Sequence, residues 1–386
     1  MKSLFSILLP TKNRPQYLCQ ALESIIKQDI SNIEIIVSNN GKCKITAELV
    51  KKYSSDPRIK YFEPRKTLDM PTHWNTISSY ATGLYTLILT DRSVLKKDSL
   101  KIIEKTINEF NNPLIVSWPW DLYNEELKLL IPHKFSNDKI LKFSSKQKIK
   151  DFANGNYEGY PYFLPRGLNS AIKTEFINKL KKKYKYVYRK IAPDYTSSFI
   201  CLLNSKNYIF INKSLFISQG FSVSNGSNCY KGSPREYYKD VDFKKFKHIP
   251  KSSLDLCTYG NKEDFFEMLE LCDYAKFKNY WNKIFFYKEC FSEISLKYLH
   301  NILKKEKIIY IENTVYKNLE KENAKIRKAV MSYRKKYFLI YVFKRIFIKF
   351  FPLIFQNFIK KYLYLIIFKC KIYPGALNAA GFKPYN

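Results

Sequence analysis

Short apolar runs alternate with segments of helical periodicity over the first 118 residues, and this alternation limits the possible folds more than any other feature. Apolar runs that predict strands lie at residues 4–9, 33–37, 59–62, 84–89 and 114–118, and the intervening segments that predict helices lie at 16–29, 45–53, 72–81 and 97–110. Parallel neighbours need a crossover between them, and that crossover is usually a helix. The order therefore predicts the α/β class, with a Rossmann-like, mainly parallel sheet flanked by helices.

Three polar turns follow three of the predicted strands. They lie at residues 10–15, 38–42 and 90–93. In open α/β sheets, ligands bind beyond the carboxyl ends of the strands. We therefore expect these three turns to meet at one edge of the sheet and to form the binding site.

The alternating pattern weakens after residue 118. Residues 119–165 are irregular, and the segments that follow predict helices at 170–180 and 195–203, strands within 208–217, a polar loop at 220–240 and charged helices over 262–330. We expect three parts: an α/β domain over residues 1–250, a helical extension over 251–322 and a basic amphipathic tail over 323–386.

The tail carries a large share of the net charge of +33, because no Asp or Glu follows Glu322 whereas 14 Lys and Arg do. Basic residues and Pro352 interrupt its apolar segments, so no run reaches the ~20 residues that span a bilayer. We expect two amphipathic helices on an anionic membrane surface. The alternative is a helical cap packed on the catalytic domain. Nucleic acid is not an expected partner, because the apolar side chains of residues 338–351 do not suit a phosphate backbone.

The N-terminal residues and the cysteines indicate the cellular compartment in which the protein is expected. The opening apolar run ends at Pro10 and is shorter than a secretory leader requires. The eight Cys include no Cys-x-x-Cys pair, so a zinc site is not expected. We expect reduced thiols and a cytoplasmic protein that is peripheral on the cytosolic face of the membrane.

Four linked segments carry a resemblance to a known family. They are residues 7–15 (ILLPTKNRP), 21–25 (ALESI), 33–41 (IEIIVSNNG) and 80–95 (YATGLYTLILTDRSVL). In this order they resemble family-2 glycosyltransferases of the bacterial surface-glycan type, closely from residue 4 to about 100 and loosely to 225. The resemblance implies the GT-A fold and an inverting, hexosyltransferase-type transfer. The sugar would pass from a nucleoside-diphosphate sugar to a hydroxyl group of a glycan or lipid-linked acceptor, as in lipopolysaccharide or capsule biosynthesis.

The resemblance also implies a set of donor-binding residues. They are Pro10, Thr11, Lys12, Asn13, Arg14, Asn39, Asn75, Asp91 and Arg92. Two of them depart from the family pattern. Lys12 stands where an aromatic residue often stacks on the base, and Asn39 stands where an acidic residue commonly contacts uracil. An amide can still donate and accept hydrogen bonds at that position.

Arg92 is the largest departure, because a metal-coordinating Asp is usual at its position. The family implies Mn²⁺ or Mg²⁺, with Asp91 as a ligand, but a guanidinium cannot ligate a cation. Two readings stay open. Arg92 takes over part of the metal's role by holding phosphate, or it points to solvent and activity is reduced or lost. In the second reading, the chain is a catalytically degenerate partner subunit that binds a nucleotide sugar.

For the general base, the resemblance indicates Asp194, which begins a predicted helix. The alternative is that Asp194 only caps this helix. Asp151 and Glu158 are weaker candidates, and Arg166 is a weak candidate for contact with phosphate or an anionic acceptor. His73 is expected near the surface or behind the donor-contacting residues, and the aromatic residues of 157–163 are a weak candidate platform for the acceptor sugar.

Overall fold

In a computed structural model, the chain forms two units, which are described separately below. The first unit comprises residues 1–148, 158–220 and 361–386, and the second comprises 149–157 and 221–360. The structure describes residues 2–134, 136–155, 163–231, 246–249, 255–299, 304–335, 365 and 370–382. Glu158 and residues 338–351 of the predicted tail lie outside these ranges.

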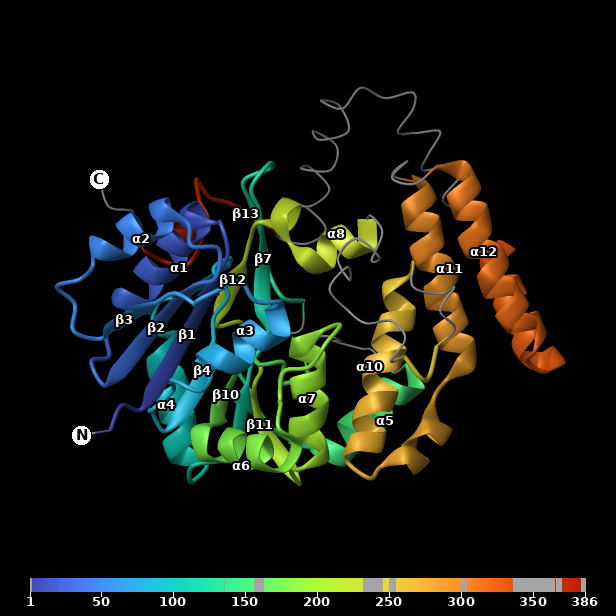
Figure 1. Ribbon diagram of the computed structural model, residues 1–386, viewed down its shortest axis with the longest axis horizontal. Coiled ribbons are helices and arrows are strands. Elements are labelled where there is room, and N and C mark those ends of the chain that lie inside the picture. Colours follow the sequence, from blue (N-terminus) through green and yellow to red (C-terminus); the bar gives the residue numbers. More distant parts are fainter. Residues whose placement is uncertain are drawn as a thin grey trace. The chain divides into compact units, whose positions relative to one another are not determined.

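An eight-stranded sheet forms the centre of the first unit (Figure 1). In spatial order its strands are β3 (Ile59–Phe62), β2 (Ile33–Asn39), β1 (Phe5–Thr11), β4 (Tyr85–Ile88), β10 (Ser170–Lys173), β6 (Ile115–Ser117), β11 (Asn207–Ile211) and β9 (Ile140–Ser144). Strands β3, β2, β1 and β4 are parallel, whereas β10 is antiparallel to both of its neighbours and β9 is antiparallel to β11. The predicted α/β class with a mainly parallel sheet is confirmed.

Helices connect the strands. In the first unit they are α1 (Pro15–Ile26), α2 (Lys44–Lys51), α3 (Met70–Ile77), α4 (Ser99–Glu109), α6 (Thr174–Tyr184) and α7 (Pro193–Leu203), while α5 (Ser145–Asn154) spans the boundary between the units. Proline suits the first position of α1, where its missing N–H has no partner to lose. Leu18, Leu22 and Ile25 of α1 pack in one buried core with alternate residues of β1. Burial of each such side chain contributes about 2 kcal/mol.

Two sequence predictions are wrong in detail. Residues 170–180 were expected to form a helix, but Ser170–Lys173 form β10, and α6 begins only at Thr174. Four residues carry too little periodicity to distinguish strand from helix, and their pairing with β4 and β6 decides the outcome. Residues 119–165, expected to be irregular, contain β7 (Trp120–Asn124), β8 (Leu129–Ile131), β9 and all of α5.

A smaller sheet of five strands completes the first unit. Its order is β13 (Lys371–Ile372), β8, β7, β12 (Phe216–Ser218) and β5 (Ser93–Leu95). The short helix α15 (Ala376–Ala379) packs its buried Ala376 and Leu377 against side chains of β5, β7, β8 and β12. The last part of the predicted tail, residues 370–382, therefore belongs to the first unit.

The described residues of the second unit are mainly helical, and the expected helical C-terminal extension is present. The helices of this unit are α8 (Asn225–Lys231), α10 (Cys257–Leu271), α11 (Lys283–Leu299) and α12 (Lys305–Glu320), and residues 324–335 are also helical. The sequence predicts a loop over residues 220–240, but residues 225–231 form α8, so the prediction is wrong there. Residues 232–240 lie outside the described ranges. Within the described residues, no helix has the length and apolar character needed to cross a membrane.

Glu34 joins three parts of the main sheet. Its buried carboxylate accepts hydrogen bonds from the Ser6 hydroxyl of β1, from the Thr82 hydroxyl and amide (2.9 and 2.7 Å) and from the Lys60 ammonium of β3 (2.7 Å). Gly83 lies so close that an added Cβ would be 2.8 Å from the Ser6 amide nitrogen. Burial alone would raise the pKa of Glu34, but the hydrogen bonds from Lys60, Ser6 and Thr82 outweigh it and lower the pKa to about 2.

We predict that Glu34→Gln destabilises the fold at neutral pH and flattens its acid sensitivity. The carboxylate stabilises the native state fully above its ordinary pKa of 4.5, and this contribution is lost as the pH falls towards 2. We expect the free energy of unfolding to fall by about 2 kcal/mol at pH 7. This is less than the full pKa shift implies, because Lys60 is partly exposed and solvent screens its charge. Urea unfolding at pH 7 and pH 3 measures both effects. Exposed Glu48→Gln is the matched control, and an equal loss in both variants would contradict the prediction.

Candidate active site

The three polar turns meet at the carboxyl edge of the main sheet. Thr11 and Asn39 are register partners at the ends of β1 and β2, and the Asn40 amide donates to the Thr11 carbonyl (2.9 Å). The Thr11 hydroxyl donates to the Asp91 carboxylate (2.9 Å), which follows β4. Asn13 adopts a left-handed conformation (φ 57°), and its side chain lies against Gly41, where an added Cβ would clash with it.

Asp91 is the most buried charged group at this edge, with 1% of its surface exposed. One carboxylate oxygen, Oδ2, accepts from the Thr11 hydroxyl and pairs with the Arg14 guanidinium (Nε–Oδ2 3.0 Å). Burial raises the pKa of the Asp91 carboxyl above its usual value, while Arg14, Thr11 and Arg92 oppose the rise. Within the described residues, the other oxygen, Oδ1, has no hydrogen-bond partner.

Arg92 turns towards the backbone rather than into solvent. Its Nη1 donates to the Gln219 carbonyl (2.7 Å), and burial lowers the pKa of the guanidinium while Asp91 opposes this. Gly220 has a positive φ of 65°, and an added Cβ there would lie 3.0 Å from the Tyr17 ring and 3.1 Å from Arg92 Cδ. The reading in which Arg92 points to solvent is therefore wrong.

This edge does not fit a tightly held divalent cation. No cluster of three His, Cys, Asp or Glu side chains that could hold a metal occurs among the described residues. At the expected position, only Asp91 Oδ1 is without a partner, and Arg14 and Arg92 place two positive charges beside it. Divalent Mg²⁺ or Mn²⁺ requires several oxygen ligands, and nearby guanidinium groups repel it.

Asn39 is fully engaged within the protein. It is completely buried, its Nδ2 donates to Tyr61 Oη, Glu63 Oε1 (both 2.9 Å) and the Cys43 carbonyl (3.0 Å), and its Oδ1 accepts from the Cys43 amide (3.3 Å). A direct contact of Asn39 with a nucleobase would break these bonds. Tyr61 and Glu63 are exposed beside it, so they are the groups at this position that can reach a ligand.

Lys12, His73 and Asn75 have different surroundings. Pro10 is buried in β1, whereas Lys12 is exposed. His73 is buried and its Nε2 contacts the Ser38 hydroxyl (2.7 Å), and burial together with the Lys12 charge lowers its pKa to about 4.

Asn75 joins α3 to the 187–188 segment, since its Oδ1 accepts from the amides of Val187 and Tyr188 (both 3.3 Å) and its Nδ2 donates to the Tyr188 carbonyl (2.5 Å). Its position indicates support of the edge rather than contact with a ligand.

Arg166 and Asp194, predicted separately, form an ion pair (Nη1–Oδ2 3.0 Å), with 10% and 15% of their side chains exposed. The Arg166 guanidinium also lies 4.8 Å from the ring centres of both Trp120 and Tyr195. The N-cap of α7 is Ala192 rather than Asp194, which lies within the first turn, and the Asp194 carboxylate binds Arg166. The capping alternative is therefore wrong, and the role of Asp194 as a base stays a prediction.

The loop that carries Arg166 is held at the same edge by residues that the sequence did not single out. Asn169 donates to the Trp118 and Leu164 carbonyls (2.9 and 3.0 Å) and accepts from the Arg166 amide (2.9 Å). The Ile88 amide at the end of β4 donates to the Gly167 carbonyl (3.3 Å). This loop precedes β10, and the antiparallel direction of β10 brings it to the carboxyl ends of β4 and β6.

The remaining predicted groups lie elsewhere. Asp151 lies in α5, within the second unit, and Glu158 is outside the described residues. Of the aromatic residues over 157–163, only Phe163 is described. Its half-buried ring packs against Phe143 and Phe210, with centroids 5.6 and 5.1 Å away, and the acceptor platform stays a prediction.

Comparisons with known proteins agree with this architecture. Residues 6–181 match the model of glycosyl transferase family 2. Glycosyltransferase GlyA of Streptococcus pneumoniae is 25% identical over 213 residues, which cover 55% of this chain but only 30% of that protein. The GalNAc(5)-diNAcBac-PP-undecaprenol beta-1,3-glucosyltransferase of Campylobacter jejuni is 27% identical over 259 residues, which cover 61% of this chain and 80% of that protein. The chain thus spans less than a third of the length of GlyA.

A solved structure shares the fold. The crystal structure of S. aureus TarS 1-349 in complex with UDP-GlcNAc superposes with a TM-score of 0.50 at 16% identity, over 87% of this chain and 92% of that chain. At this level of identity, the likeness shows the fold alone.

We predict that the Arg166–Asp194 pair is strongly coupled. In a double-mutant cycle of Arg166→Met and Asp194→Asn, we expect a coupling energy of about 1–3 kcal/mol, because both groups are largely buried and each variant removes one charge of the ion pair. Urea unfolding of the four proteins gives this energy. The exposed pair Lys105–Glu109 (3.7 Å) is the control and should give less than about 0.5 kcal/mol. Equal coupling in the two pairs would show that the Arg166 contact does not hold Asp194.

Proposed function

We propose that the chain, whose residues 6–181 match glycosyl transferase family 2, transfers a sugar from a nucleoside-diphosphate sugar to a hydroxyl group of a glycan or lipid-linked acceptor, with inversion at the anomeric carbon. The observation that carries this proposal is the cluster of Thr11, Arg14 and Asp91 at the carboxyl edge of the sheet. It places buried, preorganised charge at the position where α/β sheets bind ligands.

In the proposed donor complex, fixed guanidinium groups neutralise the diphosphate. A leaving diphosphate needs positive charge that is already in place when the bond breaks. The Gln219 carbonyl accepts a hydrogen bond from Arg92 Nη1 and holds the side chain in place. The Arg92 side chain therefore loses little conformational freedom when the donor binds. Asp91 holds Arg14 in the same way. We therefore propose that the requirement for a divalent metal is weak or absent, in support of the reading in which Arg92 replaces part of the metal's role.

The donor nucleoside is proposed to be uridine. The TarS structure is a complex with UDP-GlcNAc, which makes uridine diphosphate sugars the first candidates for this chain. Asn39 holds Tyr61 and Glu63 at the carboxyl edge of the sheet. In the proposed complex the Tyr61 hydroxyl and the Glu63 carboxylate, rather than the Asn39 amide, contact the base. A carboxylate can accept the N–H of a uracil ring.

In the proposed reaction, Asp194 accepts the proton of the acceptor hydroxyl as that oxygen bonds to the anomeric carbon. The bond between this carbon and the diphosphate oxygen breaks, and the nucleoside diphosphate leaves with the electron pair. Arg166 acts as a positioning residue, because its ion pair orients the carboxylate of Asp194.

The acceptor is proposed from a relative and the location from the sequence. The name of the Campylobacter relative describes an undecaprenyl-diphosphate-linked glycan as its acceptor, which favours a lipid-linked glycan here. We propose a peripheral position on the cytosolic face of a membrane, reached through the basic and apolar tail. This proposal rests on sequence, because residues 336–364 lie outside the described ranges.

We predict that uridine diphosphate binds without metal and that Arg92→Gln weakens this binding about 10–100-fold, the loss expected for charge-assisted hydrogen bonds. Calorimetry with uridine, guanosine and thymidine diphosphates, each with EDTA or with Mn²⁺, measures the affinities. Arg327→Gln, on an exposed helix of the second unit, is the matched control, and an unfolding curve verifies that each variant is folded. Binding only with Mn²⁺ would refute metal independence. A chain that binds none of these nucleotides would refute the transferase proposal.

We also predict that Asp194→Asn lowers turnover by about 10²–10⁴-fold while nucleotide binding changes little, because a general base acts on the chemical step. Release of uridine diphosphate from UDP-GlcNAc, with water as the acceptor, measures the rate. Asp138→Asn removes an exposed carboxylate and should leave the rate unchanged. Wild-type protein that binds the donor but releases no product would favour the degenerate partner-subunit reading.

A further inference from the structure

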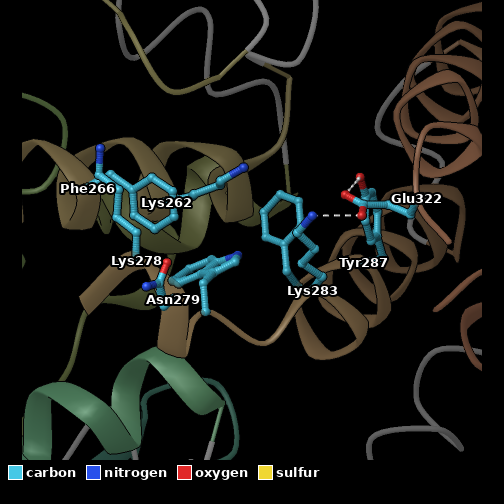
Figure 2. A pocket seen from close by; sticks show the side chains of 9 residues that line it. Lys262, Phe266, Lys278, Asn279, Lys283, Tyr287 and Glu322 are labelled. Carbon is cyan, nitrogen blue, oxygen red and sulfur yellow. Dashed lines mark hydrogen bonds and ion pairs between the residues drawn. The ribbon is translucent and has the colours of Figure 1, made fainter. Parts of the chain in front are cut away.

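The second unit contains a cavity that the proposed transfer reaction does not use. Its volume is about 390 Å³, near the lower end of the ~300–1,000 Å³ that is usual for small-molecule sites. Figure 2 shows side chains from α10, from the 275–280 turn and from the start of α11 around it. Four aromatic rings line the cavity together with Lys262, Lys278 and Lys283, and only one lining residue, Glu322, is acidic.

The three lysines differ in their partners. Lys278 pairs with Glu270, and Lys283 pairs with Glu322 (2.8 Å), which Figure 2 shows as a dashed line. Within the described residues, the ammonium of Lys262 pairs with no carboxylate. It lies over the rings of Phe266 and Phe286, with distances of 5.4 and 5.0 Å to their centroids. Burial lowers the pKa of Lys262, which means that its charge is poorly solvated. The cavity therefore offers a cation that an anion would stabilise.

Trp281 offers a second unsatisfied donor. Its indole N–H is buried and has no acceptor in the part of the chain that the structure describes. A buried donor without a partner destabilises the folded state, so such groups are uncommon in proteins. The Trp281 ring itself is fixed, because it stacks on Phe265 (5.7 Å between centroids) and meets the Phe266 ring edge-on (5.2 Å).

We propose that this cavity binds an anionic sugar, namely a pyranose ring that carries a phosphate or carboxylate group. Aromatic side chains pack against the C–H faces of a sugar, and the Lys262 ammonium and the Trp281 N–H supply the donors for its anionic oxygens. An apolar ligand would leave these donors unsatisfied, and an inorganic anion would leave the aromatic rings uncovered. All nine lining residues belong to the second unit, so the site does not depend on the proposed donor site.

The test uses the full chain and two readouts, calorimetry and tryptophan fluorescence. The ligands are glucose 6-phosphate, glucuronate, methyl glucoside, inorganic phosphate and uridine diphosphate. We expect glucose 6-phosphate and glucuronate to bind at least tenfold more tightly than methyl glucoside or inorganic phosphate. The other three Trp residues lie in the first unit, so a fluorescence change that disappears in Trp281→Phe locates the ligand.

Two lysine variants distinguish a built site from general charge attraction. Lys262→Gln should weaken glucose 6-phosphate binding about tenfold or more, whereas Lys276→Gln, which removes an exposed charge from the same turn, should change it less than twofold. Equal losses in both variants would overturn the proposal, as would inorganic phosphate binding as tightly as the sugar phosphate. Uridine diphosphate should not compete with glucose 6-phosphate, and competition that Arg92→Gln abolishes would assign the binding to the donor site instead. The transferase proposal is tested separately by the nucleotide titrations.

Discussion

A buried carboxylate at the end of β4 sets the arrangement of the candidate site. Asp91 is almost completely removed from solvent, and a charge in that position is tolerated only when it is paired and hydrogen-bonded. Thr11 and Arg14 supply these partners, and they fix the turn after β1 against the turn after β4. Asn13, between these two residues, adopts a left-handed conformation.

The same carboxylate explains the unusual position of Arg92. With Oδ2 already bound by Thr11 and Arg14, the Arg92 side chain extends to the Gln219 carbonyl, and Gly220 leaves the space that it needs beside Tyr17. A second acidic residue in place of Arg92 would add negative charge next to a buried anion and would need a cation to compensate. Arg92 supplies positive charge within the chain itself. The Arg92 guanidinium therefore contributes positive charge beside Asp91 and provides no oxygen ligand for a cation.

The sequence predicts the parts of the site that depend on local pattern. The strands up to β4 and the three polar turns are predicted within a few residues, because apolar periodicity and parallel crossovers determine them. The partners of individual side chains are not predictable in this way. The bonds from Asn39 to Tyr61 and Glu63 depend on the register of β2 with β3, and the pairing of Arg166 with Asp194 depends on the antiparallel β10. The cavity of the second unit shows no sequence signal, because its rings and lysines come from a turn and two helices without a shared period.

The contact between Arg166 and Asp194 fixes the position of the proposed base, because the Arg166 Nη1 lies 3.0 Å from the Asp194 Oδ2 and both side chains are largely buried. The rings of Trp120 and Tyr195 lie against the same guanidinium and share its positive charge through cation–π contacts. They also hold Arg166 in place, so that Asp194 keeps one orientation. In the proposed reaction the carboxylate is thus held in a single position relative to the acceptor hydroxyl and the anomeric carbon, and such alignment of reacting groups lowers the barrier to reaction.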